Sequence, residues 1–233
     1  MRYLIWIIGI ICFSSCHYQT ALKSNSNAVT LMSRAQYEDA LSELQDAITR
    51  SPAFLPAYYN RAIVYSHLKK NEEALADMNY FISNVTDNAL AYYSRGLIYE
   101  NLNRDREAIQ DYSRAINLRP DLLNAYHYRG IARYKMKDID GALTDYNAAL
   151  SMGLQSSALY YNRGVIFHQK RQFTEAIESY AQSIQIDPSN AKAYYNRALS
   201  SLMLNQRQEA LRDLEIAKRL GHLHTEEVIA RHF

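Results

Sequence analysis

The sequence predicts an all-α solenoid built from short helix–turn–helix units. Alanine recurs at one constant interval along most of the chain, at Ala40, Ala74, Ala108, Ala142, Ala176 and Ala210. This interval is a 34-residue period, which is typical of arrays of helix pairs in which each unit buries its core against its neighbours. The composition agrees, because only 4 Pro and 7 Gly in the whole chain leave little room for loops.

Six units of equal length follow from this spacing. With the recurrent alanine at position 20, the units are residues 21–54, 55–88, 89–122, 123–156, 157–190 and 191–224. The third unit carries the fullest pattern of aromatic, small and proline positions. At positions 4, 8, 11, 20, 24, 27 and 32 it has Tyr92, Gly96, Tyr99, Ala108, Tyr112, Ala115 and Pro120. We expect the small residues at positions 8 and 20 to face each other where the two helices of a unit cross.

This pattern resembles the tetratricopeptide repeat (TPR). The resemblance covers residues 21–224 and implies a right-handed superhelical solenoid of six TPR units. The first unit, residues 21–54, is a degenerate copy because its first helix lacks the aromatic residue. Residues 225–233 are expected to form a C-terminal helix that caps the apolar face of the last unit.

The N-terminus has the features of a secretory signal. Met1 and Arg2 precede an apolar run from Leu4 to Phe13, which is shorter than the roughly 20 residues that span a bilayer. The small residues Ser14 and Ser15 then stand directly before Cys16. This order resembles the bacterial lipoprotein signal, which implies a signal peptide of residues 1–15 and lipidation at Cys16. An ordinary cleaved signal or an uncleaved anchor is the alternative.

The residues after Cys16 bear on localisation and on the linker. His17 follows the cysteine in place of Asp, and in lipoproteins this implies the outer membrane, facing the periplasm, over the inner membrane. Residues 16–27 are polar and rich in Ser and Asn, so we expect a flexible tether that runs into the first repeat.

Columns of equivalent residues point to a binding surface. In the TPR family, positions 2, 5, 9 and 12 of the first helix line a concave groove. Position 5 is aromatic in five units, and position 12 adds two further ring side chains. These candidate partner-binding residues are Tyr59, Tyr93, His127, Tyr161, Tyr195, Tyr134 and His168. Tyr is a common anchor at protein interfaces, but the alternative is that these residues pack between adjacent first helices.

A second column combines arginine with aspartate. Position 7 is Arg61, Arg95, Arg129, Arg163 and Arg197, whereas position 23 is Asp77, Asp111, Asp145 and Asp213 in four of the same units and Ser179 in the fifth. The arginines alone suggest an anion or nucleic-acid site. Their recurrence with aspartate favours structural ion pairs between the two helices of each unit, because the planar guanidinium binds a carboxylate in bidentate fashion.

Composition and motifs exclude most chemistry. The formal charge of +2 gives no basic surplus for nucleic acid. Both cysteines, Cys12 and Cys16, lie ahead of the repeats, and no metal-ligand cluster, phosphate-binding loop or catalytic motif is present, so we expect no cofactor and no metal.

The sequence therefore predicts a non-enzymatic protein–protein interaction scaffold, anchored by lipid in the bacterial envelope and binding an unidentified protein partner. The combination of leader and repeats resembles TPR lipoproteins of the NlpI type and of the PilF/PilW type. The alternative is a structural or oligomerisation module, such as a homo-oligomer within pilus or secretion machinery.

Overall fold

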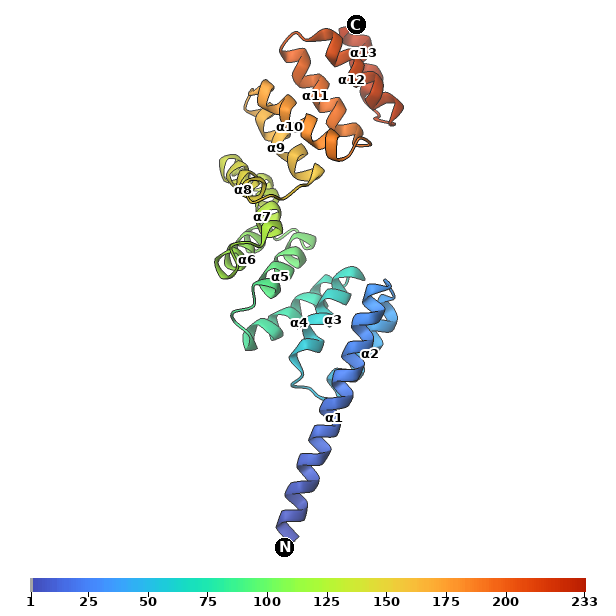
Figure 1. The fold of residues 1–233 in the computed structure, drawn as a ribbon, viewed down its shortest axis with the longest axis vertical. Helices are drawn as coiled ribbons and strands as arrows, with labels where there is room; N and C mark the ends of the chain where they lie inside the picture. Colours follow the sequence, from blue (N-terminus) through green and yellow to red (C-terminus); the bar gives the residue numbers. More distant parts are fainter. Residues whose placement is uncertain (1) are drawn as a thin grey trace. The chain divides into compact units, whose positions relative to one another are not determined.

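The computed structural model describes the backbone of residues 2–233 and the side chains of residues 17–233. Within this part of the chain, thirteen elements follow one another as antiparallel pairs, and all are α-helices (Figure 1). They are α1 (Arg2–Ser33), α2 (Tyr37–Arg50), α3 (Leu55–His67), α4 (Asn71–Asn84), α5 (Ala89–Asn101), α6 (Asp105–Leu118), α7 (Leu123–Lys135), α8 (Ile139–Ser151), α9 (Ser157–Gln169), α10 (Phe173–Ile186), α11 (Ala191–Met203), α12 (Arg207–Arg219) and α13 (Thr225–His232). The predicted all-α repeat solenoid is confirmed.

From α3 to α12, each helix pair falls within one repeat unit of the sequence. The helices group into two compact units, an N-terminal unit of residues 1–120 and a C-terminal unit of residues 121–233. Among the described residues, none of the helices combines the length and the apolar character needed to cross a membrane.

The same turn ends the first helix of every repeat. Position 15 takes a left-handed backbone conformation, with φ between 57° and 68°, at Ala35, Lys69, Asn103, Lys137, Arg171 and Asn205. The backbone N–H of the next residue then donates to the carbonyl oxygen at position 11, as Arg104 does to Tyr99 at 2.8 Å. This bond satisfies a carbonyl that the end of the helix leaves free. The turn is thus built without glycine, although a left-handed conformation costs a residue with a Cβ atom roughly 1–2 kcal/mol.

The helices of one repeat cross closely, and the residue sizes at the crossing are matched. An added Cβ at Gly96 would lie 2.5 Å from Cε1 of the buried Tyr112. Gly130 and Gly164 stand in the same relation to Tyr146 and Tyr180. Where position 24 is smaller, position 8 is alanine, in the pairs Ala62 with Met78 and Ala198 with Leu214. Because the helices are closely packed, the side chains at positions 8 and 24 share a limited volume, so a larger residue at one position goes with a smaller residue at the other.

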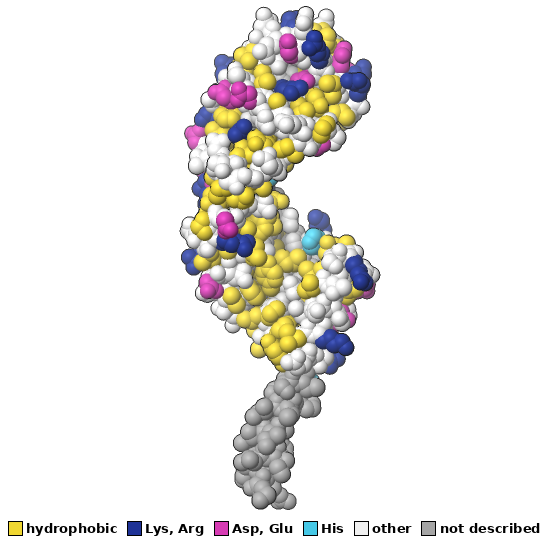
Figure 2. All heavy atoms as spheres, in the orientation of Figure 1, with side chains coloured by type: hydrophobic (Ala, Val, Ile, Leu, Met, Phe, Trp, Pro, Cys, Tyr) yellow, Lys and Arg dark blue, Asp and Glu magenta, His cyan; other side chains and the backbone are white. Residues whose placement is uncertain are grey.

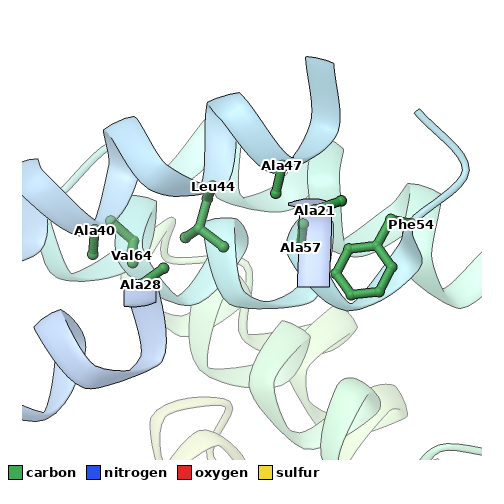
Figure 3. Close-up of a cluster of buried hydrophobic side chains, with 8 residues drawn as sticks. All are labelled: Ala21, Ala28, Ala40, Leu44, Ala47, Phe54, Ala57 and Val64. Atoms are coloured by element: carbon green, nitrogen blue, oxygen red, sulfur yellow. The ribbon is translucent and has the colours of Figure 1, made fainter. Parts of the chain in front are cut away.

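The predicted flexible tether is wrong for residues 17–27, because they belong to α1 and pack against the first repeat. Ala21 and Ala28 are fully buried among side chains of α2 and α3 (Figure 3). Between them, the Ser24 hydroxyl donates a hydrogen bond of 2.8 Å to Asp46 of α2. These three small residues recur at helical spacing on one face, while the other polar residues that suggested a tether lie outside this face. The side chains of Cys16 and of the predicted signal lie outside the described part of the chain.

The C-terminal helix α13 covers the end of the last repeat. Its Val228 and Ile229 pack against the buried side chains of Ala198, Ala210 and Leu214. The apolar surface that would otherwise lack a following repeat is thereby removed from water.

Candidate partner-binding surface

Hydrogen bonds between neighbouring repeats show that the first helices lie side by side within each unit. Asn60 of α3 donates to Asn25 of α1 at 2.8 Å, and Tyr161 of α9 accepts from Asn196 of α11 at 2.9 Å. Each bond joins position 5 of one repeat to position 6 of the next. We call the surface formed by positions 2, 5, 9 and 12 of these helices the first-helix face.

In the N-terminal unit, the predicted tyrosines are half-buried packing residues. The Tyr59 hydroxyl lies 3.4 Å from the Ser94 hydroxyl in the next repeat, and its ring lies 5.2 Å from Phe81. The Tyr93 ring lies 6.0 Å from the ring of Tyr112. Each ring thus tightens the contact between helices while part of it stays accessible, so the two readings of position 5 are combined in one side chain.

The most accessible apolar side chains on this face are aliphatic, and the sequence reasoning missed them. Leu22 and Leu90, at position 2, are 37% and 42% exposed, and Val29, at position 9, is 48% exposed. Leu22 and Val29 come from α1. The sequence predicts a tether for part of α1 and a degenerate repeat for the rest, so these positions were not considered for binding. Extending the columns of positions 2 and 9 back into residues 21–54 would have found both. The space-filling view shows hydrophobic side chains over α5 and also over α4, which is a second helix and lies outside this face (Figure 2).

This face of the N-terminal unit carries almost no charge. Of the twelve residues at its positions 2, 5, 9 and 12, only Glu100 has a side chain that is charged at neutral pH. Its carboxylate already accepts a 2.6 Å hydrogen bond from the Tyr112 hydroxyl. The surface therefore suits apolar contacts better than the capture of an ion.

In the C-terminal unit, the predicted residues are engaged with their neighbours. The Tyr195 ring stacks on His222 at a centroid distance of 4.0 Å, and His168 Nδ1 lies 2.8 Å from the Ser200 hydroxyl. Tyr134 is half-buried against the cluster around Tyr146. Burial raises the pKa of Tyr161, whose hydroxyl holds Asn196. These contacts orient the rings and leave them half-buried.

His127 differs from the other residues at position 5. It is 8% exposed, so the expectation that it lines an accessible surface is wrong. Its imidazole is shorter than a tyrosine ring and sits inside, with ring centroids 5.4 Å from Tyr128 and 6.0 Å from Tyr146. Within the described part of the chain, its Nε2 atom is buried without a hydrogen-bond partner. Burial lowers the pKa of this imidazole, so His127 is neutral at pH 7.

The predicted arginine–aspartate pairs are present in four repeats. In each pair, Nε and one terminal nitrogen of the guanidinium donate to the two carboxylate oxygens at 2.6–2.9 Å. The pairs are Arg61–Asp77, Arg95–Asp111, Arg129–Asp145 and Arg197–Asp213. These carboxylate hydrogen bonds raise the pKa values of Arg61, Arg95 and Arg197. The pairs account for this column as a structural device between the two helices.

Arg163, in the fifth repeat, has no carboxylate opposite it. Its Nε donates to the Ser179 hydroxyl at 3.1 Å. Burial lowers the pKa of Arg163, and the attraction of Tyr160 and Glu178 offsets the effect of burial only in part.

Three family models match the chain. Two described as "Tetratricopeptide repeat" match residues 25–87 and 89–122, and one described as "TPR repeat" matches residues 166–204. Together these stretches exceed half of the sequence. The chain belongs to the tetratricopeptide repeat family. The second stretch coincides with the third repeat unit, which carries the fullest repeat pattern.

Solved TPR structures resemble this one over most of its length. PilF of Pseudomonas aeruginosa is 18% identical, with a TM-score of 0.81 over 92% of this chain and 99% of that one. YrrB, described as a TPR protein with an unusual peptide-binding site, is 22% identical, with a TM-score of 0.69 over 82% and 98%. MamA of Desulfovibrio magneticus is 19% identical, with a TM-score of 0.66 over 71% and 94%. No match was found among curated proteins.

TPR proteins are typically protein-binding scaffolds without enzymatic activity. Among residues 17–233, no group of three or more His, Cys, Asp or Glu side chains lies close enough together to hold a metal ion. The half-buried rings and exposed aliphatic side chains of the first-helix face can bind a partner by burying apolar area.

Proposed function

We propose that this TPR protein is a scaffold that binds a protein partner on its first-helix face and is held in the bacterial envelope by a lipidated Cys16. The observation that carries the binding surface is the set of exposed aliphatic side chains beside half-buried tyrosines on an almost uncharged face. A folded protein gains little by exposing Leu22, Val29 and Leu90 together on one face, whereas a partner that covers them gains the free energy of apolar burial.

The binding surface is tested by capture from an envelope extract with the full chain and two matched variants. Leu90→Ala and Tyr93→Ala together remove contact area from the first-helix face. Tyr80→Ala removes a ring that is as exposed as Leu90 but lies on the second helix α4. We expect the double variant, and not Tyr80→Ala, to lose captured proteins. Equal capture by all three would contradict the proposal.

The same variants separate the scaffold from an oligomerisation module. If the first-helix face served self-association, the double variant would have a lower molar mass in light scattering after size exclusion. We expect an unchanged mass, because the proposed partner is a different protein.

The lipid anchor is supported by the leader sequence. Since α1 continues into the first repeat, the anchor would lie about 8 Å along the helix from the buried Ala21, at about 1.5 Å per residue. The first repeat would thus be held close to the bilayer surface. Cys16→Ala is expected to release the protein from membranes in fractionation. A variant that stays in the membrane fraction would contradict the lipid-anchor proposal and would leave the proposal of the binding surface unaffected.

A further inference from the structure

One position in the repeat pattern is filled in four repeats and left small in the sixth. Position 11 carries a long or aromatic side chain at Tyr65, Tyr99, Arg133 and Phe167, whereas the sixth repeat has Ser201. The side chain at this position packs beside the position-7 arginine of the same repeat. In the sixth repeat that space is not filled by the first helix.

The aromatic residues at position 11 stack over guanidinium groups. The Cζ atoms of Arg61, Arg95 and Arg163 lie 5.6, 5.7 and 5.8 Å from the ring centroids of position 11 in their repeats. Each of these arginines also has the position-4 tyrosine within a similar distance. Arg197, in the sixth repeat, keeps only the position-4 ring, that of Tyr194 at 5.6 Å.

A pocket of about 310 Å³ occupies this place in the sixth repeat, between α10, α11 and α12. Ile177 supplies an apolar wall, and Ser201 and Arg197 line the side where the second, third and fifth repeats have an aromatic ring. The Arg197 side chain is 24% exposed, against 18% for Arg61 and Arg95, whose repeats carry the ring. The missing aromatic residue thus leaves a hollow beside a guanidinium that is slightly more exposed than those of Arg61 and Arg95.

The lining favours a neutral ligand. Arg197 is held by Asp213 through two hydrogen bonds of 2.7 Å, and the rim carries one further acid, Glu209, and one further base, Arg212. The charges of the lining therefore cancel. Because Asp213 fixes the guanidinium, little conformational freedom is lost when a ring covers it.

We propose that this pocket binds a phenylalanine or tyrosine side chain of a protein partner, which takes the place of the absent position-11 ring. The ring would contact Ile177 and lie over Arg197, as Tyr99 lies over Arg95 in the third repeat. A buried apolar cavity of about 150 Å³ already holds benzene, so the pocket has room for a tolyl or cresyl group. None of its residues belongs to the first-helix face, so this site and the proposed function stand or fall separately.

The direct test is a titration of the full chain with p-cresol, the side chain of tyrosine as a free molecule. Backbone amide NMR signals of Ile177 and Ser201 should shift and saturate, with Kd on the order of millimolar for so small a ligand. If the lipidated chain is kept in detergent, the concentration of free p-cresol is measured, because detergent micelles also take up p-cresol. The saturated analogue 4-methylcyclohexanol should bind roughly two- to fivefold more weakly, because it lacks the π-face. Absence of saturable shifts at these residues in the wild-type protein overturns the proposal.

Two substitutions assign the binding to this pocket. Ser201→Tyr restores the aromatic residue and should abolish the p-cresol shifts while raising the melting temperature. Ser201→Ala leaves the hollow open and should bind as the wild type does. A folded Ser201→Tyr variant with wild-type binding overturns the proposal. Should that variant not fold, Ser201→Leu, which fills less space, carries the same expectation. Leu90→Ala, on the first-helix face, should leave the p-cresol shifts unchanged.

Discussion

Removal of Asp145 is the sharpest test of how the repeat is held together. Its carboxylate is 2% exposed and accepts hydrogen bonds from two arginines. Arg129 donates to it at 2.9 and 2.6 Å, and Arg133 donates at 2.8 Å. The substitution Asp145→Ala removes the buried carboxylate that Arg129 and Arg133 share, and the carboxylate that Arg133 keeps is that of the more exposed Asp138, at 3.6 Å.

The size of the effect follows from this burial. Breaking a buried ion pair by removing one partner costs about 3–5 kcal/mol. Both arginines keep some contact with water, so we expect the lower end, about 3 kcal/mol. For a chain of this length, about 3 kcal/mol lowers the melting temperature by roughly 6–12 °C. Arg129→Ala should cost less than Asp145→Ala, because Asp145 keeps Arg133 as its partner.

The assay is thermal unfolding followed by circular dichroism at 222 nm, with hydrogen exchange at the amides of α7 and α8. Exchange is included because a repeat array loses stability locally before it unfolds as a whole. Arg104→Ala is the control, since the Arg104–Glu107 pair lies on the surface and should contribute nothing measurable. The reasoning is refuted if Asp145→Ala melts together with Arg104→Ala and the wild type.

Three further predictions concern the core, pH and the turns. Gly96→Ala places a Cβ 2.5 Å from the Tyr112 ring and should lower the free energy of unfolding in urea by about 1–3 kcal/mol. Adding Tyr112→Leu, which copies the Ala198–Leu214 pair, should recover part of this loss. No recovery would contradict the argument that the two side-chain volumes are matched. Because burial lowers the pKa of His127, the unfolded chain binds a proton first as pH falls below about 6.5, so stability is complete above that pH and is lost below it. His127→Phe should reduce the fall in the urea midpoint between pH 7.5 and pH 5. Part of the fall should remain, because the pKa values of His168 and His222 are also lowered. An unchanged fall would show that His127 is not responsible. Lys137→Gly should stabilise the protein by about 0.5–1 kcal/mol in the same assay, because Lys137 has φ of 68°, and destabilisation would contradict the assignment of strain to this turn.

Repetition made most of the fold predictable. A constant period places equivalent residues in equivalent surroundings, so the helices predicted for one unit also predict the helices of the other units. The ion pairs were predictable for the same reason, because arginine and aspartate recur together at one fixed separation along the chain. Ser179 breaks the recurrence, and Arg163 is the arginine without a carboxylate there.

Prediction failed where composition was used in place of position. Residues 17–27 are polar on average, yet Ala21, Ser24 and Ala28 form one small-residue face that α2 and α3 bury. Average polarity describes a flexible segment well only when no face of it can pack. His127 failed for a related reason, since the column of position 5 does not record that a shorter ring sits deeper than a tyrosine.

The sequence by itself determined the all-α fold, the repeat period and the ion pairs, because these depend on spacing along the chain. Only the tertiary structure decided which columns are accessible. It showed that the predicted tyrosines are half-buried, that Leu22, Val29 and Leu90 are the exposed large apolar members of the first-helix face, and that the small Ser201 leaves a pocket. Exposure is a property of what packs on a residue, and that depends on neighbouring repeats as much as on the residue itself.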